Sequence, residues 1–159
     1  MSTVKWRDPL GCLVALAFLA GCGAAKEDPP KKAPVVQAKP SDESRRFPTK
    51  NQTRMQLVER DLLDKGILPG GNLAEYKHRG KTYQQFLVRA ESAEKAALLL
   101  FDLKTTLNNP KYLAHMGGYF GTDREQPVYI FAKGVFLAGF IGLAEKEAEL
   151  LAREFAARL

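Results

Sequence analysis

The chain has 159 residues, a hydrophobic fraction of 45% and a formal net charge of +6. This length suits one small folded domain. Two cysteines and two histidines in the whole chain exclude a disulfide framework and leave too few soft ligands for a clustered His/Cys metal site. We therefore expect a domain that is stable through its hydrophobic core alone, with no metal and no cofactor.

The N-terminal residues have the layout of a secretory signal peptide. Lys5 and Arg7 precede an apolar run over residues 10–20, which is shorter than the roughly 17–25 residues that a membrane-spanning helix requires. The run ends in Leu19-Ala20-Gly21-Cys22. An incidental cysteine in a soluble secreted protein and an uncleaved anchor are the alternatives to cleavage and lipidation at this position.

Leu19-Ala20-Gly21-Cys22 resembles the lipobox of bacterial lipoproteins. The resemblance implies cleavage after Gly21 and a lipidated Cys22 as the first mature residue, with fatty acyl chains such as palmitate that hold the protein on a membrane. Gly23 follows the cysteine, and by the same resemblance it favours the outer membrane, with the domain facing the periplasm. Cys12 leaves with residues 1–21 and cannot form a mature disulfide.

Residues 22–50 read as a disordered tether. Prolines punctuate Lys, Glu, Asp, Ser and Ala, and bulky apolar residues are rare, so the segment buries too little surface to offset its ordering entropy. Seven basic residues face four acidic ones here. The charge therefore belongs largely to the tether, where it suits anionic lipid head groups, and we expect no nucleic-acid partner.

The remaining residues, 51–159, are predicted to form a single domain. Apolar spacing predicts a first helix over residues 53–65, and Pro69-Gly70-Gly71-Asn72 predicts a turn. Strands over residues 73–78 and 81–89 follow, joined across Arg79-Gly80. Ser92 is expected to cap a second helix, which ends at Asn108-Asn109-Pro110.

The second half of the domain is predicted to hold three more strands and a last helix. Residues 111–120 read as a poor strand that Gly117-Gly118 interrupts. Residues 127–132 and 135–141 read as a hairpin with Lys133-Gly134 as its turn, and the last helix covers residues 144–158. The expected fold class is α+β: a mainly antiparallel sheet of about five strands with packed helices, in the order α-ββ-α-βββ-α.

The C-terminal pattern is similar to an uncharacterised family of bacterial exported proteins. The residues that carry the similarity are the glycines from Gly117 to Gly121, then VYIFAKGVFLAGFIGL, then AEKEAELLAREFAARL. The resemblance covers residues 72–159 and implies a β-α-β-β-β-α unit, with no activity to transfer.

The predicted hairpin 127–141 has no polar face. With Phe131 paired to Phe136, alternation puts Tyr129, Phe131, Phe136 and Phe140 on one face and aliphatic residues on the other. Either the N-terminal helix or a loop covers the second face, or the aromatic face is exposed and binds a hydrophobic ligand, a partner or a second copy.

Chemistry-bearing residues are sparse. The glycines at 117–121 lack the Lys-Ser/Thr of a phosphate-binding loop and are expected at a bulge or a close strand contact. Ser92 is explained as a helix cap. A set of His115, Asp123 and Arg124 is the one enzyme site that the sequence offers, and spacing alone assembles no acid–base pair.

These observations predict a lipid-anchored protein of the bacterial cell envelope with a non-catalytic binding or assembly domain. Tyr129, Phe131, Phe136 and Phe140 are the candidate contact face, and the expected partners are the membrane, an envelope protein or a second copy. A carrier of a lipid or other apolar ligand, held between sheet and helices, is the alternative. An enzyme built on His115 is a third hypothesis.

Overall fold

The structure, a computed structural model, describes residues 39–159. The predicted signal peptide, Cys22 and residues 22–38 of the predicted tether lie outside the described residues. Within the described part, neither helix has the length and apolar character that crossing a membrane requires.

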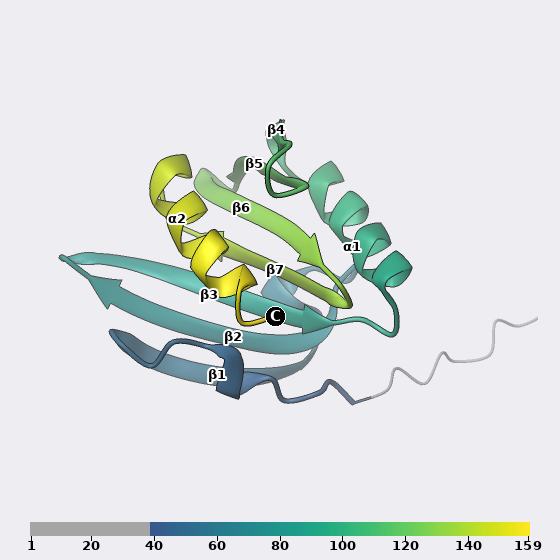
Figure 1. The fold of residues 1–159 in the computed structure, drawn as a ribbon, viewed down its shortest axis with the longest axis horizontal. Helices are drawn as coiled ribbons and strands as arrows, with labels where there is room; N and C mark the ends of the chain where they lie inside the picture. The colour runs from purple at the N-terminus through teal and green to yellow at the C-terminus, as the bar shows by residue number, and fades with distance from the viewer. Residues whose placement is uncertain (1–38) are drawn as a thin grey trace, which may run out of the picture. The chain divides into compact units, whose positions relative to one another are not determined.

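The described chain forms one seven-stranded antiparallel sheet with two helices (Figure 1). The elements in chain order are the 3-10 turn η1 (Ser44–Arg46), β1 (Gln52–Arg60), the 3-10 turn η2 (Leu62–Asp64), β2 (Pro69–His78), β3 (Lys81–Arg89), α1 (Ala93–Thr105), β4 (Asn108–Leu113), β5 (Gly118–Asp123), β6 (Gln126–Lys133), β7 (Phe136–Ile141) and α2 (Glu145–Ala156). The strands lie in the order β1-β2-β3-β7-β6-β5-β4. The predicted five-stranded order α-ββ-α-βββ-α is therefore wrong: a strand replaces the first helix, and four strands instead of three separate α1 from α2.

The predicted helix over residues 53–65 is the edge strand β1. Met55 and Val58 suggested one helical face, but in the strand they pack into different clusters on opposite sides of the sheet. Both sides of this strand are partly covered, so its apolar residues do not alternate regularly with polar ones. Their spacing therefore also matches the period of a helix, although the segment is a strand. Pairing with β2 along residues 52–60 decides the outcome.

Glycines extend β2 beyond its predicted start. Residues 69–72 were predicted to turn, yet they pair with β1, Gly71 opposite Val58 and Pro69 opposite Arg60. A side chain at Gly70 would collide with the backbone carbonyls of Val58 and Glu59. Glycine therefore serves close strand approach here.

The predicted poor strand 111–120 is a hairpin of β4 and β5. Gly117 adopts φ +60 in the turn, and a side chain at Gly118 would collide with the carbonyl oxygen of Ile130 on β6. The expectation of a close strand contact at these glycines is confirmed at Gly118. The turn from β5 to β6 is centred on Arg124 and Glu125.

Two predicted elements are confirmed. The β2–β3 hairpin turns at Arg79 and Gly80, both with positive φ. Helix α1 begins after Ser92, whose Oγ accepts a hydrogen bond of 3.2 Å from the backbone N–H of Lys95. That bond satisfies one of the free N–H groups of the first turn.

The β6–β7 hairpin exists, but its register differs from the prediction. Lys133 pairs with Phe136 and Phe131 pairs with Ala138, so Gly134 and Val135 form the turn, with Gly134 at φ +54. A glycine with positive φ at the first loop position is typical of hairpin turns that match the strand twist. The pairing shifts by an even number of residues, so the expected division of side chains between the two faces is unchanged.

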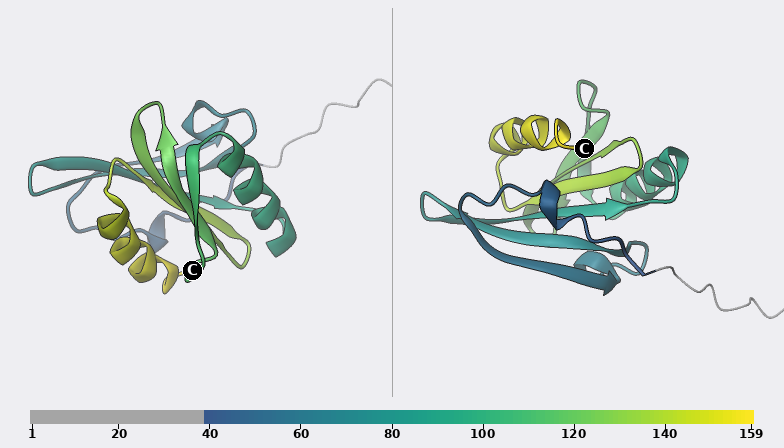
Figure 2. Two further views of the ribbon diagram at one scale, coloured as in Figure 1. Left: turned by 90° about the horizontal axis from the view of Figure 1, so that it is seen from above. Right: turned by 60° about the horizontal axis from the view of Figure 1, so that its bottom comes forward.

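Each face of the sheet carries its own hydrophobic cluster and its own helix (Figure 2). The α2 face is defined by residues that pack with this helix, principally Tyr76, Tyr83, Leu87, Tyr129, Phe131, Phe136, Phe140, Ala148, Ala152 and Phe155. The α1 face is defined by those that pack with the other helix, principally Leu62, Leu68, Leu73, Phe86, Val88, Leu100, Leu103, Leu107, Val128, Ile130 and Leu137. Strands β6 and β7 contribute to both, which explains why neither side of that hairpin is polar in sequence.

The segment over residues 41–50, which we call the strap, belongs to the folded domain. Phe47 is 3% exposed and packs on Phe155 with ring centroids 5.3 Å apart. The Tyr76 hydroxyl donates to the carbonyl oxygen of Pro48 at 2.9 Å. The predicted tether 22–50 thus contains, at its C-terminal end, residues that seal the α2 face.

Candidate functional site

The aromatic side chains that sequence reasoning selected as a contact face are buried. Tyr129, Phe131, Phe136 and Phe140 are between 0% and 5% exposed. Helix α2 and the strap cover them, so of the two expected covers, the N-terminal helix or a loop, the structure has a loop, together with the C-terminal helix. Burial raises the pKa of the Tyr129 hydroxyl to about 12, and this hydroxyl has no hydrogen-bond partner. These residues therefore form core: of the two alternatives, a covered face and an exposed aromatic face, the structure has the covered one, and the four residues are not an exposed contact face.

The hypothetical enzyme residues do not gather at one place. His115, in the β4–β5 turn, lies 3.1 Å from Glu149 of α2 through its Nε2 atom. Asp123 lies at the far end of β5, where its carboxylate contacts Lys65. The whole length of β5, roughly 20 Å at about 3.3 Å per residue, separates them. The structure pairs each with a different neighbour instead of with each other.

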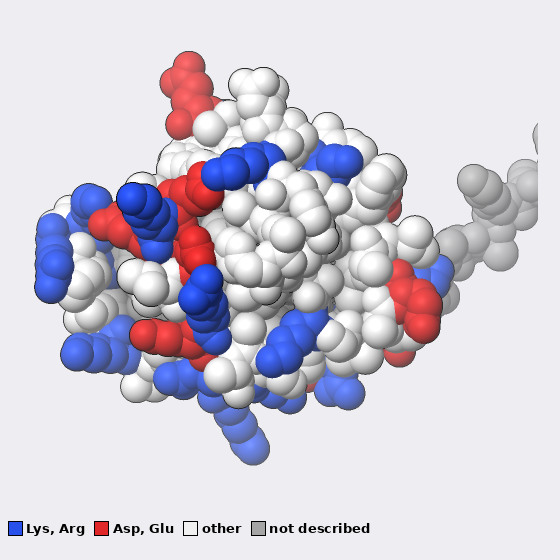
Figure 3. All heavy atoms as spheres, turned by 45° about the horizontal axis from the view of Figure 1, so that its top comes forward, with Lys and Arg blue, Asp and Glu red and all other residues white. Residues whose placement is uncertain are grey.

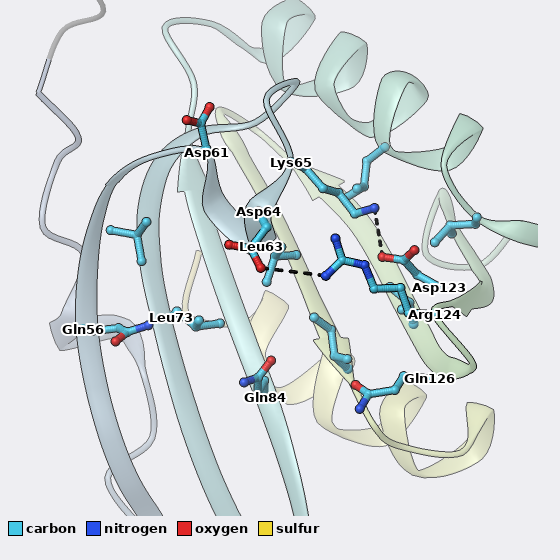
Figure 4. A pocket seen from close by; sticks show the side chains of 15 residues that line it. Gln56, Asp61, Leu63, Asp64, Lys65, Leu73, Gln84, Asp123, Arg124 and Gln126 are labelled. Atoms are coloured by element: carbon cyan, nitrogen blue, oxygen red, sulfur yellow. Dashed lines mark ion pairs between the residues drawn. The ribbon is translucent and has the colours of Figure 1, made fainter.

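A cleft of about 460 Å³ opens on the α1 face, beside the C-terminal end of α1 (Figure 4). Its floor comes from the sheet and the helix, with Leu73, Val128 and Ile141 below and Leu103 and Leu107 at one side. The cleft exists because α1 crosses only part of this face. Both apolar and polar side chains line it.

The floor of the cleft changes from apolar to polar along one row of neighbouring strands. Val128 on β6 pairs with Ile141 on β7, and Ile141 pairs with Gln84 on β3. Gln84 is opposite Glu75 on β2, which is opposite Arg54 on β1. Directly opposed residues of antiparallel strands share a face. A molecule in the cleft would therefore meet methyl groups and then an amide, and the charges of Glu75 and Arg54 lie next along the row, outside the lining of the cleft.

Two ion pairs form the rim of the cleft and join its two loops. Lys65 Nζ is 2.8 Å from Asp123 Oδ2, and Arg124 Nη1 is 3.8 Å from Asp64 Oδ2. Asp64 and Lys65 belong to the β1–β2 connection, whereas Asp123 and Arg124 belong to the β5–β6 turn (Figure 4). The rim is therefore close to neutral and presents both signs of charge.

The rim loops hold several residues in the left-handed backbone region. Asp61, Leu63, Asp64 and Arg124 have φ between +46 and +62, a conformation that non-glycine residues rarely adopt. Such strain persists only where surrounding contacts fix the backbone, and it is enriched at binding sites. The concentration of these residues around one cleft supports a binding role.

Amide side chains supply the remaining polar lining. Gln56, Gln84 and Gln126 reach the cleft from β1, β3 and β6 (Figure 4). Gln84 Nε2 donates a long hydrogen bond of 3.5 Å to Glu75. A carboxamide both donates and accepts, so this lining matches a ligand that carries amide or hydroxyl groups.

Arginines cluster at the strap on the other side of the molecule, where they have structural partners. Arg46 and Arg89 both contact the Glu43 carboxylate, at 2.8 and 2.9 Å. Burial raises the pKa of Glu43, but hydrogen bonds from these two arginines outweigh it and hold the pKa below its usual value. A second hollow lies at the strap and is lined by four arginines. Because Arg46 and Arg89 hold the strap through Glu43, we assign this hollow a structural role.

The described residues contain no group of three or more His, Cys, Asp or Glu side chains arranged to hold a metal ion. Asp61, Asp64 and Asp123 all line the cleft, and two of them, Asp64 and Asp123, pair with cationic side chains of the protein.

Comparison with protein-family models and with curated proteins finds no match to this chain. The function is therefore argued from the site alone. Sequence reasoning missed the cleft because it assigned residues 53–65 to a helix. One signal was present: on β3, the polar residues Thr82 and Gln84 lie on the same face as the core residues Phe86 and Val88.

Proposed function

We propose that this protein is a lipid-anchored component of the bacterial cell envelope whose domain binds a peptide-like segment of another envelope component in the cleft of the α1 face. The anchor is Cys22, and Gly23 favours the outer membrane with the domain facing the periplasm. The activity is binding or assembly without catalysis.

The observation that carries the proposal is the row from Val128 and Ile141 through Gln84 to Glu75 and Arg54. An extended peptide has the matching sequence of groups, because a small apolar side chain suits the methyl floor and its backbone amides suit the carboxamides. Because the rim carries both signs of charge, we expect it to orient the bound peptide and not to select peptides of one net charge.

The lipid anchor is tested by matched cysteine substitutions. Cys22→Ala is expected to abolish labelling by radioactive palmitate and to release the mature protein from membranes. Cys12→Ala serves as the control and is expected to change neither, because Cys12 lies within the part that is removed. Continued labelling of Cys22→Ala would overturn the anchor.

The cleft is tested by photo-crosslinking in native envelopes. A photoreactive amino acid at Gln126, at the mouth of the cleft, is expected to give a discrete adduct, whereas the same group at Glu154 on α2 is not. Gln56→Trp fills the cleft and should remove the adduct. Leu57→Trp, at the neighbouring position on the opposite face of the same strand, should leave it unchanged.

Three outcomes would contradict this site. They are equal adducts from both positions, an adduct that Gln56→Trp does not affect, and one that Leu57→Trp removes equally. An adduct that consists only of lipid would favour the alternative function, a carrier of apolar molecules, over peptide binding.

A further inference from the structure

Helix α1 carries large apolar side chains on the side that faces solvent, among exposed polar residues such as Glu94, as well as on the side that faces the sheet. Ala96, Leu100 and Leu103 are buried against the sheet. On the outside, Leu98 is 56% and Phe101 is 55% exposed. A surface helix ordinarily turns polar residues outward, and one that is apolar all round is usually covered on both sides.

The exposed apolar surface continues from α1 to the neighbouring strands. Lys104 Nζ lies 5.1 Å from the ring centroid of Phe101 and equally far from that of Tyr119 on β5. In Figure 3, charged side chains crowd around α2, and the part of that face toward α1 is largely uncharged. This outer side of α1 is an extended patch rather than a single exposed residue.

The charges beside the patch have a directional arrangement. Lys95 and Asp102 are both exposed and lie about two turns apart, so they share one flank of the helix with Leu98 between them. The cation lies toward the N-terminal end and the carboxylate toward the C-terminal end. A copy of the same helix placed antiparallel would therefore set Lys95 against Asp102 twice, whereas a parallel copy would oppose like charges.

We propose that the outer side of α1 is a self-association surface, on which a second copy of this chain packs its own α1 antiparallel about a two-fold axis near Leu98. In such an isologous contact residue i meets j and j meets i, which the Lys95 and Asp102 pattern satisfies. Leu98 lies near the axis, and Phe101 extends the apolar contact. The proposal is independent of the cleft.

A contact made mainly by one helix per copy is small for a stable dimer. Confinement to a membrane raises the effective concentration of the copies and compensates for the small area. For this reason the test is made with the mature protein in native envelopes.

Disulfide crosslinking gives a direct measurement, because the chain has only Cys12 and Cys22: under the proposed lipid anchor, on which this test rests, Cys12 is removed and the sulfur of Cys22 carries lipid. Leu98→Cys is expected to give a disulfide-linked dimer on mild oxidation. Leu150→Cys is the matched control: Leu150 is also a helix leucine and is 65% exposed, but it lies on α2, and its substitution should give monomer. Both positions are exposed, so neither change should impair folding.

Charge reversal then tests the antiparallel arrangement. In the Leu98→Cys chain, Lys95→Glu is expected to lower the dimer yield roughly fivefold, because two favourable pairs become two repulsive ones. Adding Asp102→Lys should restore the yield. Equal dimer from positions 98 and 150, no loss with Lys95→Glu, or no recovery in the double reversal would each overturn the proposal.

Discussion

The α2 face and the α1 face of the sheet each bury one helix, but only the α2 face is closed. Tyr76, Tyr129 and Phe140 on the α2 face are between 0% and 1% exposed, with the strap residue Phe47 packed among them. On the α1 face the apolar cluster ends at Val128 and Ile141, where the cleft begins.

The difference arises from what lies beyond the helices. The strap adds a buried aromatic ring to the α2 face, whereas the corresponding part of the α1 face carries polar side chains such as Gln84 and Glu75. A closed aromatic face contributes stability, because buried apolar area is the main favourable term in folding. The open face, with its strained loops, contributes less to stability, and its cleft leaves room for a ligand to bind.

The largest expected effect is on the closed face. Phe47→Ala should lower the free energy of unfolding by about 3–5 kcal/mol, because it removes a buried ring and leaves a cavity. Phe101→Ala, on the exposed side of α1, is the matched control and should change it by about 0.5 kcal/mol or less. Urea denaturation of both variants measures the contrast, and equal losses would show that the two faces do not differ as described.

A smaller effect is expected at the polar contact that holds the strap. Asn72 is 1% exposed and its side chain bonds the Glu43 N–H at 2.8 Å and Asp42 Oδ1 at 2.9 Å. Asn72→Ala should cost about 1–3 kcal/mol, since it removes two hydrogen bonds, one of them to a carboxylate, and leaves the partly buried Glu43 N–H without this acceptor. Gln84→Ala in the cleft should cost about 0.5 kcal/mol or less, because its own hydrogen bond is long. A large loss at Gln84 would make that side chain structural.

The smallest predicted effect is a pH dependence of strap attachment. The pKa of Glu43 is lower in the folded chain than its ordinary value of 4.5, so its contribution to stability is complete above that pH and is lost as the pH falls through the folded pKa. Thermal unfolding at pH 7 and at lower pH should show wild type losing more stability than Glu43→Gln. An equal loss of stability in wild type and Glu43→Gln would show that ionisation of Glu43 does not stabilise the attachment of the strap.

Local signals predicted the elements that local chemistry determines. Ser92 predicted the start of α1, and Arg79-Gly80 predicted the β2–β3 turn, because caps and turns depend on a few neighbouring residues. The even-numbered register error in the β6–β7 hairpin left the assignment of Tyr129 and Phe131 to one face intact.

Elements that depend on distant pairing were missed. The spacing of Met55 and Val58 was interpreted as one helical face. In the structure the two residues pack on opposite sides of the sheet, and only the pairing with β2 shows that this segment is a strand. Phe47 lay within a proline-rich stretch, and nothing near it in sequence signals its contact with Phe155. The cleft combines the β1–β2 connection with the β5–β6 turn, so its composition becomes visible only once the topology is known.

The most direct test of a functional open face is thiol accessibility in native envelopes compared with purified protein. Single cysteines replace Gln126 at the cleft and Lys146 on α2, and a maleimide reagent measures the rate of labelling. We expect Gln126→Cys to react several-fold more slowly in envelopes than in purified form, with Lys146→Cys unchanged. Unchanged labelling at Gln126→Cys, or protection at Lys146→Cys alone, would contradict the assignment of binding to the α1 face.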